Sequence, residues 1–304
     1  MGTVRRSLLV AVLAGAMATI PAAAADKNAA ERLGYPAGAK LLIIHADDLA
    51  VSHSVDRASF AALERGDVTS ASIMVPCPWF TEVAAYAREH PGADLGLHLT
   101  LTSEWKTYRW GPVAVGKDLR GLLDPDGYFW AESAPVAKNA KPEEVEVEIR
   151  AQIDRALKAG IRPTHLDSHM GAVLTPSFFA VYVKVAHEYG IPFLAFRSPA
   201  IGDSDIVPDA VLIAGSNVKP ENWREWYVHQ VQLLKPGLTE LIVHLGYDDA
   251  ELQAIMGNVP YGSAWRQRDF DALASPEFKK SLESNHTTLV GWKQIRAALQ
   301  SKQQ

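Results

Sequence analysis

The sequence predicts a single α/β domain, a variant (β/α) barrel with parallel strands inside and helices outside. Three observations lead to this class. Short apolar segments alternate with amphipathic segments of helical periodicity along most of the 304 residues. The alternations are more numerous than a short open sheet requires. No internal repeat or Ser/Gly-rich linker divides the chain, whose 48% hydrophobic residues suffice for one large core.

The first half of the predicted domain follows a regular strand–helix order. The apolar run after Lys40 predicts a strand, and the next segment places Val55, Ala58 and Leu63 on one helical face. Pro91 and Gly92 end the second helix. We therefore expect strands at 40–46, 69–75 and 94–100, with helices at 54–65 and 80–90.

The second half continues the alternation after an irregular segment at about 102–141. That segment has weak periodicity and many Gly, Pro and aromatic residues, and a loop so long in a compact domain is usually functional. Its aromatic side chains could contact a substrate or pin the loop to the barrel. Beyond it we expect helices at 142–159, 177–189, 221–234, 248–255 and 268–284, and strands at 164–167, 193–196, 240–244 and 287–291.

Residues 1–25 have the three-part pattern of a signal peptide. Arg5 and Arg6 precede an apolar stretch at 8–20, and small residues follow as far as Ala25. A membrane anchor is the alternative, but the stretch is shorter than the ~20 residues that a span needs. We expect a mature domain at 26–304 that is exported to the periplasm or secreted, without membrane attachment after cleavage.

Charge and cysteine content exclude several classes of function. The formal net charge is −5 and the basic residues are scattered, which excludes a nucleic-acid partner. Cys77 is the single cysteine, so no intrachain disulfide forms, and no His or Asn in the sequence marks it as a catalytic thiol. The oligomeric state stays open, and a homo-oligomer is one of the alternatives.

Polar residues at the ends of four predicted strands carry the functional signal. The carboxyl ends of barrel strands converge on one mouth, so side chains placed there would meet. A single buried histidine is easily explained by packing, but the repetition at equivalent places is not. The residues are Asp47, Asp48, His98, Asp167, His169 and His244.

Their chemistry suggests a metal-dependent hydrolase. One carboxylate with two imidazoles is a common ligand set for Zn²⁺, Mn²⁺, Co²⁺ or Fe²⁺. A cation would also stabilise the adjacent carboxylates Asp47 and Asp48, which otherwise repel each other. One of them could bind the metal while the other takes a proton from the attacking water.

Six segments resemble, in chain order, the motifs of the YdjC/ChbG-like carbohydrate deacetylases. They span about 40–292 and read ADDLAVSHSVDRA, GLHLTLT, HLDSHM, FRSP, LIVHLGY and RQRDFDAL followed by LVGW. The resemblance implies a variant (β/α) barrel that uses one divalent metal ion to remove acetyl groups from N-acetylated amino sugars such as chitooligosaccharides. Mg²⁺ or Zn²⁺ is favoured, with Mn²⁺ or Co²⁺ as alternatives, and the substrate would be a small molecule or an oligosaccharide.

Carried over position by position, the resemblance assigns roles to the strand-end residues. It implies that Asp48, His98 and His169 bind the metal and that Asp47 is the general base. His244 would be the general acid or would stabilise the reacting oxyanion.

Two further residues are candidates near the centre. The resemblance places Arg197 near the site, where it could orient a carboxylate or bind substrate. Asp167 lies two residues before His169 on the same strand face, so it could hold an imidazole or serve only as a structural acceptor.

The chain also departs from the family pattern around the substrate. Ala50 stands where the family usually has Gly, Asp56 where it often has Asn, and Gly171 where a second histidine is common. The late motif is usually His-Pro-Gly, and here His244 is followed by Leu245, Gly246 and Tyr247. The leading hypothesis is a metal-dependent carbohydrate deacetylase. The alternatives are a metal-dependent hydrolase of another amide or an ester, and a periplasmic glycan-binding protein without catalysis, which would require neither Asp47 nor His244.

Overall fold

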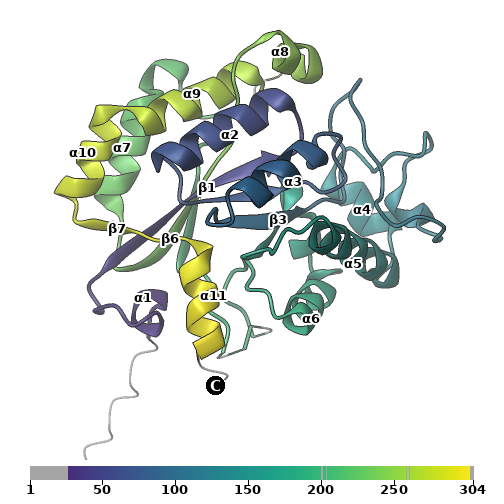
Figure 1. The fold of residues 1–304 in the computed structure, drawn as a ribbon, viewed down its shortest axis with the longest axis horizontal. Helices are drawn as coiled ribbons and strands as arrows, with labels where there is room; N and C mark the ends of the chain where they lie inside the picture. The colour runs from purple at the N-terminus through teal and green to yellow at the C-terminus, as the bar shows by residue number, and fades with distance from the viewer. Residues whose placement is uncertain (1–26, 200, 203, 258, 260, 302–304) are drawn as a thin grey trace, which may run out of the picture.

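The structure, a computed structural model, describes residues 27–199, 201–202, 204–257, 259 and 261–301. Within these residues, seven strands form one parallel sheet with helices around it (Figure 1). The predicted signal peptide at 1–25 lies outside the described residues. The predicted α/β class, with parallel strands inside and helices outside, is confirmed. The strands are β1 (Lys40–Leu49), β2 (Ser70–Ile73), β3 (Leu95–Leu99), β4 (Leu166–Ser168), β5 (Ala210–Ile213), β6 (Gly237–Val243) and β7 (Thr287–Leu289).

The sheet is an open barrel. Its order is β4-β3-β2-β1-β6-β5, and no described strand joins β4 to β5 across the remaining gap. β7 pairs with the first three residues of β1, on the edge opposite β6. All the pairings are parallel, so the carboxyl ends of the strands lie on one side of the molecule.

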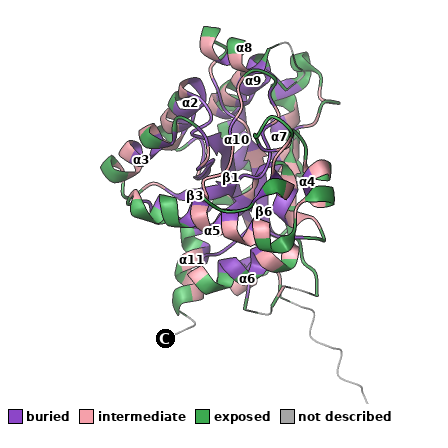
Figure 2. Cartoon of the chain, turned by 90° about the vertical axis from the view of Figure 1, so that its right-hand side faces the viewer, coloured by how far each residue is buried: buried purple, intermediate pink, exposed green. Residues whose placement is uncertain are grey.

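Helices cover the outside of the sheet. Figure 2 shows mostly buried residues in the middle of the molecule, with exposed residues on the outer sides of the helices and in loops. α7, α9 and α10 pack against one another, as do α5 and α6 elsewhere around the sheet. The helices are α1 (Ala29–Arg32), α2 (His53–Arg65), α3 (Phe80–Glu89), α4 (Ser133–Asn139), α5 (Pro142–Lys158), α6 (Phe179–Tyr189), α7 (Trp223–Leu233), α8 (Ala250–Met256), α9 (Ser263–Ala274), α10 (Pro276–Ser284) and α11 (Trp292–Ser301), with 3₁₀ turns η1 (Arg120–Leu122), η2 (His169–Leu174) and η3 (Pro220–Asn222).

Two predicted elements differ from the structure. The expected strand at 193–196 makes a single bridge, Phe193 to Leu166, and Phe196 is exposed; the next strand is β5. The expected helix at 268–284 is two helices, because Ser275 ends α9 and its side chain caps α10. Pro276, which lacks the N–H that would continue α9, starts the new helix.

α11 closes the amino-terminal end of the open barrel. A core cluster separate from the main one joins Leu41 and Ile43 of β1 and Leu238 of β6 to Trp292 and Ile295 of α11. Leu42 and Ile44, on the opposite face of β1, belong to the main core. The interior face of β1 is therefore apolar near α11 and becomes polar at His45 and beyond.

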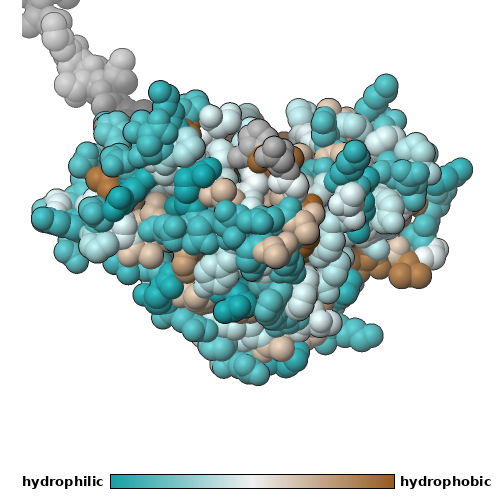
Figure 3. All heavy atoms as spheres, turned by 90° about the horizontal axis from the view of Figure 1, so that it is seen from above, coloured by the Kyte–Doolittle hydropathy of each residue, from teal (hydrophilic) through white to brown (hydrophobic). Residues whose placement is uncertain are grey.

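None of the described helices is both long enough and apolar enough to cross a bilayer. The face that includes α8 and α9 is mostly hydrophilic, with hydrophobic atoms in small patches (Figure 3).

Candidate active site and metal centre

The structure brings the three predicted metal ligands together at the carboxyl ends of the strands. Asp48 is the next-to-last residue of β1, His98 lies in β3, and His169 directly follows β4. One ligand atom of each lies within 4.8 Å of the others, and all three residues are buried. Asp48 Oδ1 lies 3.4 Å from His98 Nε2 and 3.3 Å from His169 Nδ1. The group therefore has three donor atoms facing a common point.

A β-bulge allows two consecutive carboxylates to face the same site. Regular strands point neighbouring side chains to opposite faces, but the pairing of β1 with β2 shifts register between Ala46 and Leu49. Asp48 has φ 71° and Ala50 has φ 78°, in the left-handed region that non-glycine residues rarely adopt. Buried Asp56 stabilises this turn, because its Oδ1 accepts the Ala50 N–H at 2.6 Å.

Both imidazoles are held so that a lone pair faces Asp48. His98 Nδ1 lies 2.7 Å from Asp167 Oδ1, and His169 Nε2 lies 3.0 Å from Glu104 Oε2. Each carboxylate accepts the N–H on the far side of its ring and thereby selects the tautomer with a free nitrogen toward Asp48. This carboxylate–histidine arrangement is the usual outer support of a metal ligand.

The donor set fits a divalent cation. Asp48 Oδ1 is a buried oxygen without a hydrogen-bond partner among the described residues, and two imidazole lone pairs face it. Only a cation, or protons on the rings, makes such an arrangement favourable. Burial alone would raise the pKa of Asp48, but Arg266, and His169 when its ring is protonated, hold that pKa well below its usual range, so the carboxylate is ionised.

Arg266 anchors the second oxygen of Asp48. Its Nη2 donates to Asp48 Oδ2 at 2.6 Å, and the arginine is buried. Gly246 makes room for it, because a Cβ on Gly246 would lie 3.1 Å from Arg266 Cβ and 2.7 Å from Leu252 Cδ2. The anchored Oδ2 leaves Oδ1 alone to face the histidines.

Two other groups of possible ligands are less suited to a cation. Asp167 takes part in both, once with His45 and His165 and once with Asp47 and His98. Its oxygens already lie at hydrogen-bond distance from His98 Nδ1, 2.7 Å, and His45 Nε2, 2.9 Å. Asp167 therefore supports the imidazoles from within the core, which is one of the two roles that its position left open.

Asp47 and His244 lie beside the cluster as a second pair. Asp47 Oδ2 is 3.8 Å from both His98 Nε2 and His244 Nε2, while Asp47 Oδ1 is 3.1 Å from His45 Nε2. The His244 backbone N–H donates to Asp269 Oδ2 at 3.0 Å, which fixes the loop after β6. One oxygen of Asp47 is thus fixed in the core and the other faces the site.

A buried polar layer supports Asp47 from below. His45 Nδ1 lies 2.7 Å from Ser70 Oγ, and its Nε2 is shared between Asp47 and Asp167. Burial acts to lower the pKa of His45, but the two aspartates raise it well above the usual value. Burial raises the pKa of Glu240 to about 7, and its Oε1 accepts the Trp292 Nε1–H at 3.0 Å.

Arg197 is not brought to this cluster. Its Nη2 lies 3.9 Å from Asp209 Oδ1, and Asp209 accepts the Leu238 N–H at the start of β6, the opposite end of that strand from His244. Arg266 is instead the arginine at the centre. Arg266 and Asp269 belong to the motif RQRDFDAL, which was the one sequence signal that linked them to the site. Nothing in the sequence indicated Glu104.

A cavity of about 430 Å³ opens above the cluster. Asp48, His169, His244 and Arg266 line its floor. The aromatic loop both lines this cavity and pins itself to the barrel. Trp105 is in the cavity wall, whereas Tyr108 OH donates to the Val51 carbonyl at 2.8 Å and Trp110 Nε1 to the Thr102 carbonyl at 2.8 Å. The segment 102–141 also contains η1 and α4, which the sequence did not predict.

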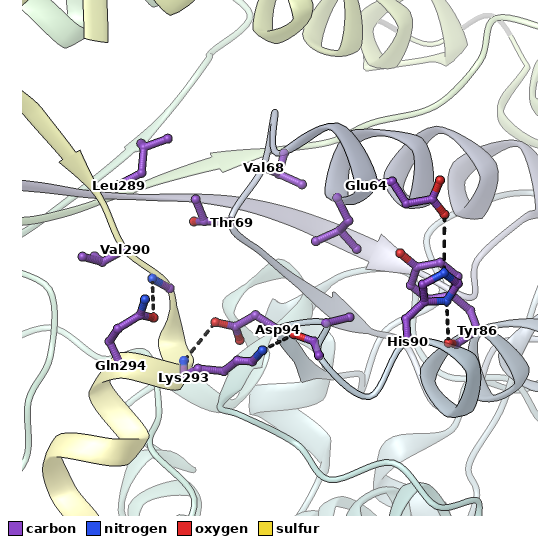
Figure 4. Close-up of a pocket in the computed structure, with 14 residues that line it drawn as sticks. Glu64, Val68, Thr69, Tyr86, His90, Asp94, Leu289, Val290, Lys293 and Gln294 are labelled. Atoms are coloured by element: carbon purple, nitrogen blue, oxygen red, sulfur yellow. Dashed lines mark hydrogen bonds and ion pairs between the residues drawn. The ribbon is translucent and has the colours of Figure 1, made fainter. Parts of the chain in front are cut away.

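A larger cavity, of about 580 Å³, lies elsewhere and has none of these groups. Figure 4 shows it between the ends of α2 and α3 and the segment from β7 to α11. Its polar groups are already paired: Asp94 Oδ2 accepts the Lys293 N–H at 2.9 Å, and His90 Nε2 lies 3.9 Å from Glu64 Oε1. Among the described residues, no group of three possible metal ligands includes a residue that lines this cavity.

Fold and site together define an open (β/α) barrel with a carboxylate–imidazole centre at the carboxyl ends of its strands. A family model described as "YdjC-like protein" matches residues 41–284. The chain belongs to the YdjC-like family, as its motifs predicted.

Named relatives and a solved structure agree with this membership. A carbohydrate deacetylase of Thermus thermophilus is 33% identical over 88% of this chain and 98% of its own length, and one of Brevibacillus brevis is 36% identical over 50% and 57%. A crystal structure from Enterococcus faecalis, named provisionally as a cellobiose-phosphate cleavage protein, has TM-score 0.71 and 28% identity, and covers 84% of this chain and 99% of its own. These relatives support a hydrolase.

Proposed function

We propose that this protein is a metal-dependent carbohydrate deacetylase that removes acetyl groups from N-acetylated amino sugars. The observation that carries the proposal is the unpartnered Asp48 Oδ1, faced by one nitrogen each of His98 and His169. Asp47 and His244 supply a base and an acid beside it. The names of the relatives add the class of substrate.

Asp48, His98 and His169 would hold the cation. A divalent cation bound there would supply a Lewis acid that polarises an acyl carbonyl and lowers the pKa of water. Glu104 and Asp167 keep the two imidazoles oriented, and Arg266 keeps Asp48 from turning. Mg²⁺ or Zn²⁺ is our first expectation, and Mn²⁺ or Co²⁺ would be accepted as well. One carboxylate with two imidazoles is a usual ligand set for Zn²⁺.

Asp47 and His244 move the protons. Asp47 Oδ2 faces the site and accepts a proton from the attacking water, while Oδ1 stays bonded within the core. His244 Nε2, 3.8 Å from Asp47 Oδ2, donates a proton to the leaving amine nitrogen or stabilises the oxyanion. His244 is half-buried at the cavity floor, so it can reach a substrate.

The acetate-release assay tests the proposal. The purified mature chain is loaded with Zn²⁺ or Mg²⁺ and incubated with N-acetylated and O-acetylated sugars. We expect acetate from the N-acetylated panel. Acetate from the O-acetylated sugars alone would mean an esterase with the same centre, and bound metal with no product on any sugar would mean a glycan-binding protein. The name of the Enterococcus relative makes a phosphorylated disaccharide a substrate worth including.

Elemental analysis of the same preparation tests the ligand set directly. We expect about one divalent ion per chain, lost in Asp48→Asn. The pattern of residues 1–25, Arg5 and Arg6 followed by an apolar stretch and small residues, supports export to the periplasm or medium. Amino-terminal sequencing of the exported protein should find a start at Ala25 or Asp26.

A further inference from the structure

The wall of the cavity above the cluster consists mainly of apolar side chains together with two glutamates. It is lined by the floor residues and by Glu104, Trp105, Ala131, Glu132, Met170, Ile213, Ala214, Met256, Val259, Tyr261 and Trp265. These come from the loop after β3, the start of α4, η2, β5 and the region from α8 to α9. Segments distant in sequence thus build one compartment over Asp48.

The mouth of this cavity collects exposed apolar side chains. Met170, Ile213, Val259 and Tyr261 are 46%, 51%, 43% and 56% exposed. Covering such side chains with a ligand removes apolar surface from water, which is favourable in free energy. The C–H faces of uncharged sugar rings can cover them. The Tyr261 ring packs against that of Trp265, with centroids 5.0 Å apart, and adds aromatic surface to the same wall.

The charged groups of the wall are acidic. Glu132 is exposed at the cavity and makes no hydrogen bond or ion pair among the described residues. Glu104 is held by His169. No lysine lines the cavity among the described residues. Its arginine, Arg266, donates to Asp48 through Nη2, while its Nε and Nη1 are buried without a hydrogen-bond partner.

The charges around the cavity sum to a negative value when a divalent cation is bound. At and beside the floor, Asp47 and Asp48 carry two negative charges, against two on a divalent cation and one on Arg266. Glu104 and Glu132 in the wall add two negative charges, so these groups together carry a net charge of about −1. A phosphate or carboxylate on the substrate would meet this negative field in a partly closed space, where water screens charges less than in bulk.

We propose that the cavity selects uncharged acylated sugars and rejects phosphorylated or carboxylated ones, with Glu132 as a specificity-determining residue. This inference rests on the proposed function, because its first test measures the rate of acetate release. It makes the charge of the substrate, rather than the size of the cavity, the discriminating property.

The test compares a neutral sugar with its phosphorylated form. For Zn²⁺-loaded protein we expect kcat/KM for acetate release from N,N′-diacetylchitobiose to exceed that for its 6-phosphate by about tenfold or more. Equal or higher kcat/KM for the phosphate would overturn the inference.

Charge reversal provides the matched variants. Glu132→Lys, at an exposed position, should reduce the preference to about twofold or invert it, and Glu132→Gln should give an intermediate ratio. Glu89→Lys, the same change on α3 outside the cavity, should keep the wild-type ratio. An unchanged ratio in Glu132→Lys would show that this residue does not set specificity.

Binding separates this inference from the proposed function. If neither sugar releases acetate, the deacetylase proposal fails, but calorimetric titration of the metal-loaded protein still compares the two ligands. We expect the neutral sugar to bind about tenfold more tightly. Failure of the neutral sugar to bind more tightly than the phosphate overturns the selection proposed here.

Discussion

Asp47 and Asp48 are sequence neighbours with different partners. Asp48 contacts Arg266 and the two histidines, whereas Asp47 contacts His45 in the core and faces His244. The bulge in β1 separates them. Their roles should therefore separate in single variants.

Asp47→Asn should keep the metal and lose turnover. The amide preserves the shape that packs on His45 but cannot accept a proton, and loss of a general base typically lowers kcat by about 10²–10⁴-fold. Metal content, KM and the melting temperature should stay near those of the wild type. The exposed Asp126→Asn serves as control. Near wild-type kcat on a good substrate would remove Asp47 from the role of base.

Glu240 gives a residue-scale prediction on pH. Burial raises its pKa to about 7, so between about pH 4.5 and 7 the unfolded chain releases this proton and the folded chain keeps it. The contribution of Glu240 to the free energy of unfolding is thus largest below pH 4.5 and falls as the pH rises to 7. The total fall is at most about 3 kcal/mol.

Glu240→Gln removes this dependence and keeps an oxygen for Trp292 Nε1. The difference in free energy of unfolding, variant minus wild type, should increase from pH 5 to pH 8. Urea titrations at both values measure it, and taking the difference cancels the titration of other groups. A difference that is constant with pH would mean that Glu240 is ionised in the fold.

The residues predicted from sequence were those whose signal is local. His98 and His169 lie at or near the carboxyl ends of apolar runs that predict strands, so their positions in the barrel could be predicted from the sequence. Arg266 sits in a helix more than 200 positions from Asp48, and its contact depends on how α9 packs. Glu104 lies in an irregular loop without periodicity. Neither contact could be inferred from spacing.

At the scale of elements, the close approach of β3 to His165, the residue before β4, has a specific requirement. Gly96 of β3 faces the imidazole of His165, and a Cβ there would lie 2.2 Å from His165 Cε1. That ring cannot move away easily, since it stacks on Trp292 with centroids 4.8 Å apart and meets His45 edge-on at 4.9 Å. Only glycine fits at this position.

Gly96→Ala should therefore destabilise the protein by about 2 kcal/mol or more, the usual scale of an overpacked core. Gly92→Ala is the matched control, because a Cβ on Gly92 meets no atom within 4 Å. Chemical denaturation of both variants measures the effect. Equal midpoints would mean that the His165 layer is loose.

Elements with strong periodicity were predicted well, and short ones were not. β1, β3 and α5 lie within a few residues of their expected bounds. β5 has only four residues with partly exposed side chains, so no apolar run marks it. α11 has a clear apolar face but follows the last predicted strand, where the alternation gave no reason to expect another helix.

At the scale of the whole molecule, the alternation of strands and helices in the sequence predicted the barrel class. It did not predict that the barrel is open between β4 and β5. Whether β4 and β5 close is decided by side chains that fill the gap, which a one-dimensional pattern does not contain. The closing of the amino-terminal end by Trp292 follows from the same packing. This arrangement leaves the carboxyl-terminal end for the cluster, whose parts come from β1, β3, the end of β4 and α9.

Because the ligands come from separate elements, metal binding should stabilise the entire fold. A ligand that binds only the folded state at 100 times its Kd adds about 2.7 kcal/mol, which for a domain of this size raises the melting temperature by about 5 °C or more. Scanning calorimetry of chelator-treated protein with and without Zn²⁺ measures this.

Asp48→Asn should abolish the rise whatever its own starting stability, while Glu132→Gln keeps it. The buried Cys77 is the chain's one cysteine, so thiol clusters cannot produce the effect. A rise that persists in Asp48→Asn would locate the cation elsewhere.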